Sequence, residues 1–413
     1  MGKTLALVAL ILAVSSVGCL HSQKQPPQST VKQERQITWK KIVLSDKFYS
    51  EGANFGDFNH DGHMGVVAGP YWYEGPDFSP EKRHEYMPVQ SFKPDNDYSH
   101  NFFAFTYDFN GDGWDDILII GFPGQDASWY ENPKGKEGHW VRHQVYDEVD
   151  DESPTFGDLL KDGKPVIVCC SHGYMGYVQP DYSDPAKPWK FHPITPHGNY
   201  QRFTHGIGFG DVNGDGRNDI LEAHGWWEQP PSLMGDPVWK KHEAKFFDNG
   251  HGDGGSQMYA YDVNGDGRND VVCSLQAHGN GLAWFEQMPD GSFKKHLIMG
   301  SKPSDNAQGV TFSQLHAVDL VDVNGDGLMD IVTGKRYFAH GSHGDIDPLK
   351  PPVLYWFELK RDGDGKAHYI AHEIDNDSGV GTQVVAKRID GQKIPSIVVG
   401  NKKGTFVFVP QEQ

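Results

Sequence analysis

Short apolar runs alternate with polar turns along most of the chain, and this alternation has a long period. A polar nonapeptide that begins Asp-x-Asn-x-Asp-Gly marks each period, at Asp57, Asp108, Asp211, Asp262 and Asp322, with a worn copy at Asp158. An apolar run precedes each copy and another follows it, as in Met258–Tyr261 and Val271–Cys273. A period of about 50 residues with a strand on each side is typical of propeller blades.

Two further runs complete each unit. The third run carries an aromatic pair followed by Glu and begins at Trp72, Trp129, Trp226, Trp284 and Trp356. The fourth run has an aromatic residue and, three positions later, a histidine: His143, His192, His242, His296 and His372. The pattern therefore predicts four strands in each blade. We interpret these five histidines as structural, because they recur with the blade.

The termini predict that the ring of blades is closed. Six units carry the nonapeptide or its remnant, and a seventh unit, from Gly379 to Phe408, supplies three runs without it. The missing fourth run stands at the other end of the chain, at Thr38–Val43. Pairing the two ends would remove an exposed sheet edge. We therefore predict an all-β fold, a seven-bladed β-propeller over residues 37–413 that is closed by an N-terminal outer strand.

The nonapeptide offers oxygen ligands at positions 1, 3, 5 and 9, a carbonyl at position 7 and a turn glycine at position 6, like the inner part of an EF-hand loop. The ligands of the four complete loops would be Asp108, Asn110, Asp112, Trp114 and Asp116; Asp211, Asn213, Asp215, Arg217 and Asp219; Asp262, Asn264, Asp266, Arg268 and Asp270; and Asp322, Asn324, Asp326, Leu328 and Asp330. The first loop keeps Asp57, Asn59 and Asp61 but has Gly65 at position 9, which predicts weaker binding. The copy at Asp158 is expected to have lost its metal.

We expect structural Ca²⁺ at four to five of these loops. The alternative is that Asn, Asp and Gly occupy these positions only because they favour turn conformations. The repeats resemble the FG-GAP (VCBS) repeats of integrin-type propellers over nearly all of the chain after residue 36. This resemblance implies the propeller fold and calcium binding, and it says little about a substrate.

A second group of polar residues is expected on the face opposite the nonapeptides, which we name the His-rich face. The starts of first strands provide Glu51, His100, Glu152, His205, Gln257, His316 and Gln383. The ends of second strands provide His172, His224, His278, Lys335, Arg336 and His340. First strands line the channel of a propeller, so these side chains should converge at its mouth. The candidate catalytic residues are His100, Glu152, His205, His224, His278, His316, Lys335 and Arg336.

Three chemistries suit such a set. Imidazoles with one carboxylate could hold Zn²⁺ or another divalent metal with an open position. A histidine could instead remove a proton α to a carbonyl. Aromatic walls could pack against sugar rings while Lys335 and Arg336 hold an oxyanion; the candidates are Tyr71, Trp72, Tyr174, Trp226, Trp227 and Tyr337. The plain alternative is a ring of polar residues around a water-filled channel.

A narrower resemblance concerns residues 200–360. The stretches THGIGFGDVNGDG, SQMYAYDVNGDG and FSQLHAVDLVDVNGDGLMDIVTGKRYFAHG are similar to the propeller of the aldos-2-ulose dehydratase family. The resemblance implies dehydration and isomerisation of anhydro-keto sugars with the help of a metal and histidines. It makes His205, His224, His278 and His316 candidates for the base or for metal ligands.

The net charge excludes one class of partner, and the cysteine content bears on disulfide bonding. The 413 residues include 37 Lys plus Arg against 56 Asp plus Glu, a net charge of −19. Nucleic acid is excluded, because its phosphates are bound by Lys and Arg. Cys169, Cys170 and Cys273 lie in apolar runs and are odd in number, so we expect buried free thiols and not a disulfide framework.

The N-terminus predicts export. Lys3 and an apolar run from Thr4 to Val14 indicate a signal peptide over residues 1–18, followed by a polar tether over residues 19–36. The Gly18–Cys19 junction resembles a bacterial lipoprotein signal, which implies a lipid anchor at Cys19 as the only membrane contact; ordinary cleavage would give a secreted protein. We expect an exported calcium-binding propeller with a carbohydrate-directed pocket on its His-rich face, acting as a keto-sugar lyase. The alternative is a non-catalytic propeller that binds a glycan or a protein.

Overall fold

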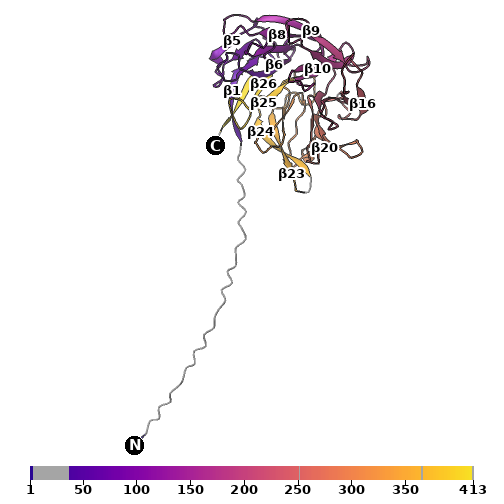
Figure 1. Ribbon diagram of the computed structural model, residues 1–413. Coiled ribbons are helices and arrows are strands. Elements are labelled where there is room, and N and C mark those ends of the chain that lie inside the picture. Colours follow the sequence, from indigo (N-terminus) through magenta and orange to yellow (C-terminus); the bar gives the residue numbers. More distant parts are fainter. Residues whose placement is uncertain (3–36, 251, 364–365, 412–413) are drawn as a thin grey trace. The chain divides into compact units, whose positions relative to one another are not determined.

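The computed structural model describes residues 1–2, 37–250, 252–363 and 366–411 (Figure 1). Most of the predicted signal peptide and all of the predicted tether, including Cys19, lie outside the described residues. The described residues from Ile37 onward form one compact unit. No helix in the described part is long and apolar enough to cross a membrane.

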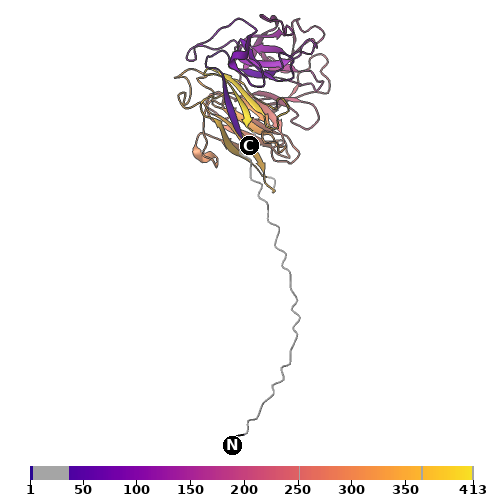
Figure 2. The ribbon, with the colours of Figure 1, turned by 90° about the vertical axis from the view of Figure 1, so that its left-hand side faces the viewer.

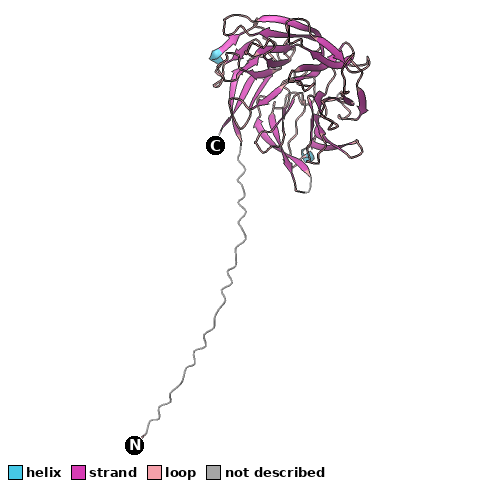
Figure 3. Cartoon of the chain, in the orientation of Figure 1, coloured by secondary structure: helices cyan, strands magenta, loops and turns pink. Residues whose placement is uncertain are grey.

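The regular structure of this unit is almost entirely strand, as Figure 3 shows. Two short 3-10 helices, η1 (Pro80–Lys82) and η2 (Pro303–Asp305), accompany the strands, and the described residues include no α-helix. Strands β2 to β5 form one four-stranded sheet in chain order: Ala53–Gly56, Gly65–Ala68, Tyr71–Tyr73 and Arg83–Glu85. Strands β21 to β24 form another: Val318–Val321, Asp330–Gly334, Leu354–Arg361 and Ala367–Asp375.

Two larger sheets each join two such units. The seven-stranded sheet contains β6 to β12: Phe103–Tyr107, Asp116–Ile120, Gln125–Glu131, Val141–Gly157, Val166–Ser171, Tyr174–Gln179 and Lys190–Pro193. Its long β9 pairs with β8 through its first half and with β10 through its second half. The eight-stranded sheet contains β13 to β20: Ile207–Gly210, Asp219–Glu222, Gly225–Glu228, Lys240–Glu243, Met258–Tyr261, Asp270–Ser274, Leu282–Gln287 and Phe293–Met299. Its halves are joined by a short parallel pairing of β13 with β17.

The last sheet brings the two ends of the described unit together. Its order is β1 (Thr38–Ser45), β27 (Gly404–Gln411), β26 (Ser396–Asn401) and β25 (Val384–Lys387). The pairing of β1 with β27 is antiparallel and runs from Thr38 opposite Gln411 to Ser45 opposite Thr405. Figure 2 shows the violet β1 beside the yellow β27. Closure by an N-terminal outer strand is therefore confirmed.

The described unit is an all-β propeller, as predicted. The first strands of successive units contact one another, as β2 does with β6 and β25, and β21 with β25. The nonapeptides connect first strands to second strands, for example between β6 and β7. First-strand starts and second-strand ends therefore lie together, on the His-rich face. The count of seven blades stays a prediction.

Apolar residues fill the spaces between neighbouring sheets. Cys169 packs with Phe109 and Trp129, whereas Cys170 packs in a different cluster with Trp227 and Trp239. Cys169, Cys170 and Cys273 are buried free thiols, as predicted.

The outer-strand histidines complete this packing. His242 stacks on Trp226 with ring centroids 3.9 Å apart, and its Nε2 lies 2.7 Å from Glu228 Oε2. The same stack recurs at Trp72–His84, Trp129–His143, Tyr177–His192, Trp284–His296 and Trp356–His372. These contacts support the structural interpretation of the repeated histidines.

Candidate functional site

Four of the candidate side chains come together on the His-rich face. Glu152 lies within β9, His205 precedes β13, His278 follows β18 and His316 precedes β21. One ligand atom from each of the four lies within 4.8 Å of those of the other three. We name these four residues the central cluster.

The contacts inside the central cluster are close but not all are hydrogen bonds. His205 Nε2 lies 3.5 Å from Glu152 Oε2, and His316 Nδ1 lies 3.9 Å from the same oxygen. His316 Nε2 lies 3.3 Å from His278 Nδ1. The separations leave room for an ion, because a metal at about 2 Å from each ligand atom tolerates ligand separations of about 3 to 4 Å.

The backbone next to the cluster orients its members. The amide of Glu152 donates to the carbonyl of Thr204 at 2.9 Å, which ties β9 to the segment before β13. His205 Nδ1 lies 2.9 Å from the carbonyl oxygen of Phe203. A carbonyl only accepts, so Nδ1 carries a proton and Nε2 is the ring nitrogen that faces the cluster. His205 Nε2 is buried and has no hydrogen-bond partner among the described residues.

A second set of contacts extends the cluster through His278. Asp345 Oδ1 lies 3.4 Å from His278 Nδ1 and 3.0 Å from His340 Nδ1. The rings of His278 and His340 stack with centroids 4.4 Å apart. Ser313 Oγ and Gln314 Nε2 each donate to the carbonyl of Ile346 at 2.9 Å, which fixes the loop that carries Asp345. Sequence reasoning missed Asp345; the only signal was the length of the loop between β22 and β23 and its His and Asp content.

Arg336 and Lys335 are buried, whereas the hypothesis of an oxyanion holder required open side chains. Arg336 Nη1 lies 3.2 Å from His316 Nδ1 and 3.6 Å from Glu152 Oε2. Its Nη2 lies 3.5 Å from Glu51 Oε1. Arg336 is therefore engaged by the protein's own groups. Lys335 Nζ has no hydrogen-bond partner in the described part of the chain.

Burial and charge favour the protonation states in which these side chains can bind a metal. Burial alone would raise the pKa of Glu152, but the neighbouring groups His205 and Arg336 lower it to about 2. Burial, and then the charge of Arg336, hold the pKa of His316 well below its usual value. Burial also lowers the pKa of His278. At neutral pH the cluster thus offers a carboxylate at Glu152 and neutral imidazoles at His278 and His316, the forms that bind metals.

Two candidates do not join the cluster. His100 is exposed, with its ring 5.3 Å from that of Phe92, because Ser99 turns inward instead and its amide donates to Glu51 Oε2. His224 lies in the two-residue turn between β14 and β15, is exposed, and has its Nε2 3.4 Å from Asp253.

Most of the expected aromatic walls are also absent from the site. Tyr71, Trp72, Trp226 and Trp227 are at most 8 % exposed. Trp72 and Trp226 are covered by the stacked histidines of their own blades, so the hypothesis that they face a sugar is wrong. Tyr174 and Tyr337 are partly exposed.

The nonapeptide loops adopt closely similar structures. Asp322 accepts hydrogen bonds from the backbone amides of Asp326 and Gly327, and the buried Asp330 accepts from Val323 and Leu359. Arg217 and Arg268, which would offer carbonyl ligands at position 7, also pair through their guanidinium groups with Asp215 and Asp266. Calcium binding by these loops stays a prediction.

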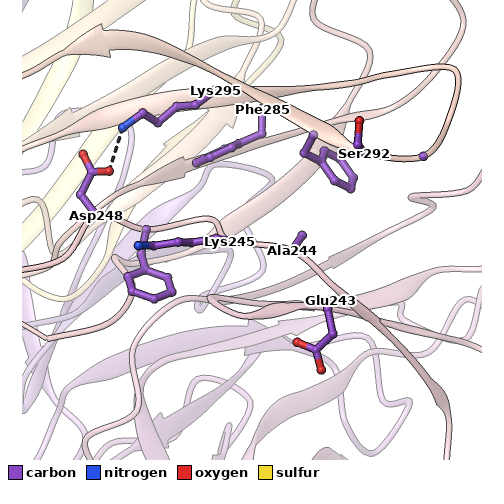
Figure 4. A pocket seen from close by; sticks show the side chains of 10 residues that line it. Glu243, Ala244, Lys245, Asp248, Phe285, Ser292 and Lys295 are labelled. Carbon is purple, nitrogen blue, oxygen red and sulfur yellow. Dashed lines mark hydrogen bonds and ion pairs between the residues drawn. The ribbon is translucent and has the colours of Figure 1, made fainter.

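A cavity away from the central cluster lies beside β16 and β20 (Figure 4). Phe285, Phe293 and Lys245 line it, and Lys295 Nζ is paired with Asp248 Oδ1 at 2.7 Å. None of the candidate residues lines this cavity.

Comparisons with known proteins bear on the repeats. The model of the FG-GAP-like repeat matches residues 108–169 and 262–333. No curated protein sequence matches the chain. A solved structure of an Agrocybe aegerita lectin, described as recognising non-reducing terminal N-acetylglucosamine, is similar with 19% identity and a TM-score of 0.47, over 83% of this chain and 81% of that one. The Tc holotoxin pore of Photorhabdus luminescens is similar with 16% identity and a TM-score of 0.34, over 78% of this chain and 16% of that one. The protein is thus an all-β propeller that carries FG-GAP-like repeats.

Proposed function

We propose that the protein is a metal-dependent lyase that removes water from keto sugars at its central cluster. The observation that carries this proposal is the convergence of Glu152, His205, His278 and His316. Three imidazoles and one carboxylate form a ligand set typical of Zn²⁺ and similar divalent metals. The orphaned, buried Nε2 of His205 supports a ligand at this position, because an unpaired buried nitrogen is costly.

The chemistry follows from a metal beside an independent base. A bound metal would supply Lewis acidity that polarises a carbonyl oxygen of the sugar. His340 is half exposed and its Nδ1 faces Asp345, so its Nε2 is free to accept a proton. In the proposed step this nitrogen takes the proton from the carbon α to the carbonyl. The C–H electron pair forms a double bond, and the β-hydroxyl leaves as water with the proton that His340 gives back. The product is an enone.

The rest of the molecule has a supporting part in this proposal. Seven blades, closed by β1, would place the cluster at the mouth of a rigid channel. Four to five Ca²⁺ ions in the nonapeptide loops would stabilise the hairpins at the opposite face. A signal peptide and a lipid anchor at Cys19 would hold the propeller outside the cytoplasm, and a carbohydrate-derived small molecule would be its substrate.

The test combines metal content with turnover. We expect the purified protein to hold one equivalent of a transition metal, and incubation with 3-keto or anhydro-keto sugars to yield an ultraviolet-absorbing enone. His278→Ala should lose both metal and turnover, whereas His224→Ala, which changes an exposed histidine outside the cluster, should keep both. Glycan binding without any enone would instead favour a non-catalytic binding propeller. Full metal content in His278→Ala would refute the assignment of the cluster.

A further inference from the structure

A second cavity lies next to the central cluster, and no part of the proposed reaction uses it. Its walls come from the end of the first half of β9, from the turn between β10 and β11, and from the segment before β13. Glu148, Asp150, His172, Tyr200, Arg202 and Phe203 are among the residues that line it. We name it the side cavity.

The side cavity is continuous with the central cluster along the backbone. Asp150 precedes the ligand Glu152 by two residues, and Phe203 precedes the ligand His205 by two. The amide of Asp151 donates to the carbonyl of Arg202 at 3.0 Å, which joins the two walls. The carbonyl of Phe203 holds His205 Nδ1. A molecule in the side cavity would therefore lie beside a molecule bound at the cluster.

The polar groups of the side cavity suit hydroxyl groups. Asp150 is 5 % exposed and lines the cavity together with Glu148. His172 Nδ1 lies 3.5 Å from Glu148 Oε1. Carboxylates accept from sugar hydroxyls, and the imidazole and guanidinium groups can donate to their oxygens. Acceptors and donors thus face one space, as binding of a neutral polyol requires.

One aromatic side chain at this cavity is free, unlike the tryptophans of the blades. Phe203 is 47 % exposed. Its ring makes an edge-on contact with that of Phe122 at a centroid distance of 6.0 Å, and the guanidinium carbon of Arg202 lies over one ring face, 6.0 Å from the centroid. Exposure of an aromatic ring to water is unfavourable, and such a ring suits the apolar face of a pyranose ring.

The backbone fixes the position of His172 at the wall of the side cavity. His172 has φ of 50°, and Gly173 after it has φ of 82°, so the two form the tight turn between β10 and β11. Positive φ at both central residues is the usual geometry of a two-residue hairpin turn. The ring of His197 lies directly on Gly173, where a Cβ would meet its Nε2 at 2.5 Å. No larger residue than glycine fits this wall.

We propose that the side cavity binds a second, non-reacting sugar unit, so that the substrate is a keto disaccharide or a longer keto glycoside and not a free keto monosaccharide. Phe203 stacks on this unit, and Asp150 and Glu148 accept its hydroxyls. This inference rests on the proposed function for the identity of the reacting unit only. Binding of the second unit itself does not depend on turnover.

The test compares one sugar unit with two. For Phe203→Ala we expect KM for 2-keto-trehalose, whose keto unit keeps a β-hydroxyl at C4, to rise about tenfold, as loss of one stacking contact predicts. KM for 2-keto-glucose should stay within about twofold. Phe203→Trp should retain the wild-type KM for both. Phe293→Ala, which removes a phenylalanine from the separate cavity of Figure 4, is the matched control and should change neither. An equal rise of KM for both sugars in Phe203→Ala would overturn the proposal.

A second measurement separates this inference from the lyase proposal. Unmodified trehalose serves as a non-reacting probe, and its binding is followed by saturation-transfer difference NMR. We expect a trehalose signal with the wild-type protein. This signal should vanish in Phe203→Ala and in Asp150→Asn. If this pattern holds while no keto sugar is turned over, the side cavity stands and the lyase proposal fails. If trehalose gives no signal with the wild-type protein, the side cavity is not a sugar site, whatever the turnover.

Discussion

Histidines occupy two contrasting environments in this propeller. Those of the outer strands, such as His242, lie between an indole face and a glutamate of the neighbouring strand. Those of the centre, such as His316 and His278, pack against each other beside the guanidinium of Arg336. The first environment satisfies the imidazole with partners from its own blade. The second gathers several imidazoles, and among them His205 Nε2 has no hydrogen-bond partner in the described residues, which is why we propose a metal at these histidines and not at those of the outer strands.

The structural role of the outer histidines predicts a loss of stability. His242→Ala removes the stack on Trp226 and leaves Glu228 with Lys240 as its remaining close partner. We expect the free energy of unfolding to fall by about 1 kcal/mol, the typical size of one ring contact or hydrogen bond. Urea unfolding measures this change, and metal content should be unaltered. His224→Ala is the control and should unfold at the same urea concentration as the wild type.

Lys402 predicts a pH-dependent effect. It is 2 % exposed and its Nζ lies 4.0 Å from the centroid of the Tyr98 ring. Burial lowers its pKa to about 8, so the folded state holds this proton less tightly than the unfolded state. The charged amine therefore costs stability below about pH 8, and the cost is relieved as pH rises toward the usual pKa of lysine.

Lys402→Met should remove this cost while filling the same space. We expect the variant to exceed the wild type in free energy of unfolding by roughly 1 to 3 kcal/mol at pH 7, and the excess to shrink by about pH 10. Urea unfolding at both pH values gives the difference. Lys40→Met, at an exposed position of β1, should show no such trend. An excess for Lys402→Met that is the same at both pH values would contradict the assigned cause.

At the scale of the strand, periodic elements were predictable and irregular ones were not. The run Met258–Tyr261 is strand β17 as predicted, because nonapeptides and aromatic pairs mark the strands on both sides. The gathering of Glu152 and His316 followed from topology, since starts of first strands must meet around a channel. Asp345 was missed because its long loop has no period. His100 was misplaced because sequence alone does not say whether Ser99 or its neighbour faces inward.

The nonapeptide loops provide an internal control for calcium. The loop at Asp322 has the complete ligand pattern, whereas the worn loop at Asp158 keeps the turn but lacks the asparagine at position 3 and the aspartate at position 9. Asp326→Ala should lower the calcium stoichiometry by one and reduce the melting temperature by several degrees, because it removes a carboxylate ligand. Asp162→Ala, at the same position of the worn loop, should leave the stoichiometry unchanged. Equilibrium dialysis with ⁴⁵Ca²⁺ measures both. Equal stoichiometry in Asp326→Ala and the wild type would refute calcium at that loop.

At the scale of the whole molecule, the two proposed kinds of metal ion would stabilise parts of different size. Each nonapeptide takes its ligands from one loop, so calcium would stabilise a single hairpin. The central cluster takes its ligands from β9 and from the flanks of β13, β18 and β21, which belong to separate units of the ring. A metal there would hold several units together, and its loss would lower the stability of the whole propeller.

Selective chelators should separate these two contributions. A metal present at 100 times its dissociation constant adds about 2.7 kcal/mol to stability. EGTA removes Ca²⁺ and transition metals together and should therefore lower the melting temperature of both the wild type and His278→Ala, and the part of the loss that added Ca²⁺ restores should be equal in the two proteins. 1,10-Phenanthroline, which prefers transition metals, should lower it in the wild type only, because His278→Ala has already lost that ion. Differential scanning calorimetry records both shifts. Equal sensitivity of the two proteins to phenanthroline would show that no metal is held by the central cluster, since only that cluster differs between them.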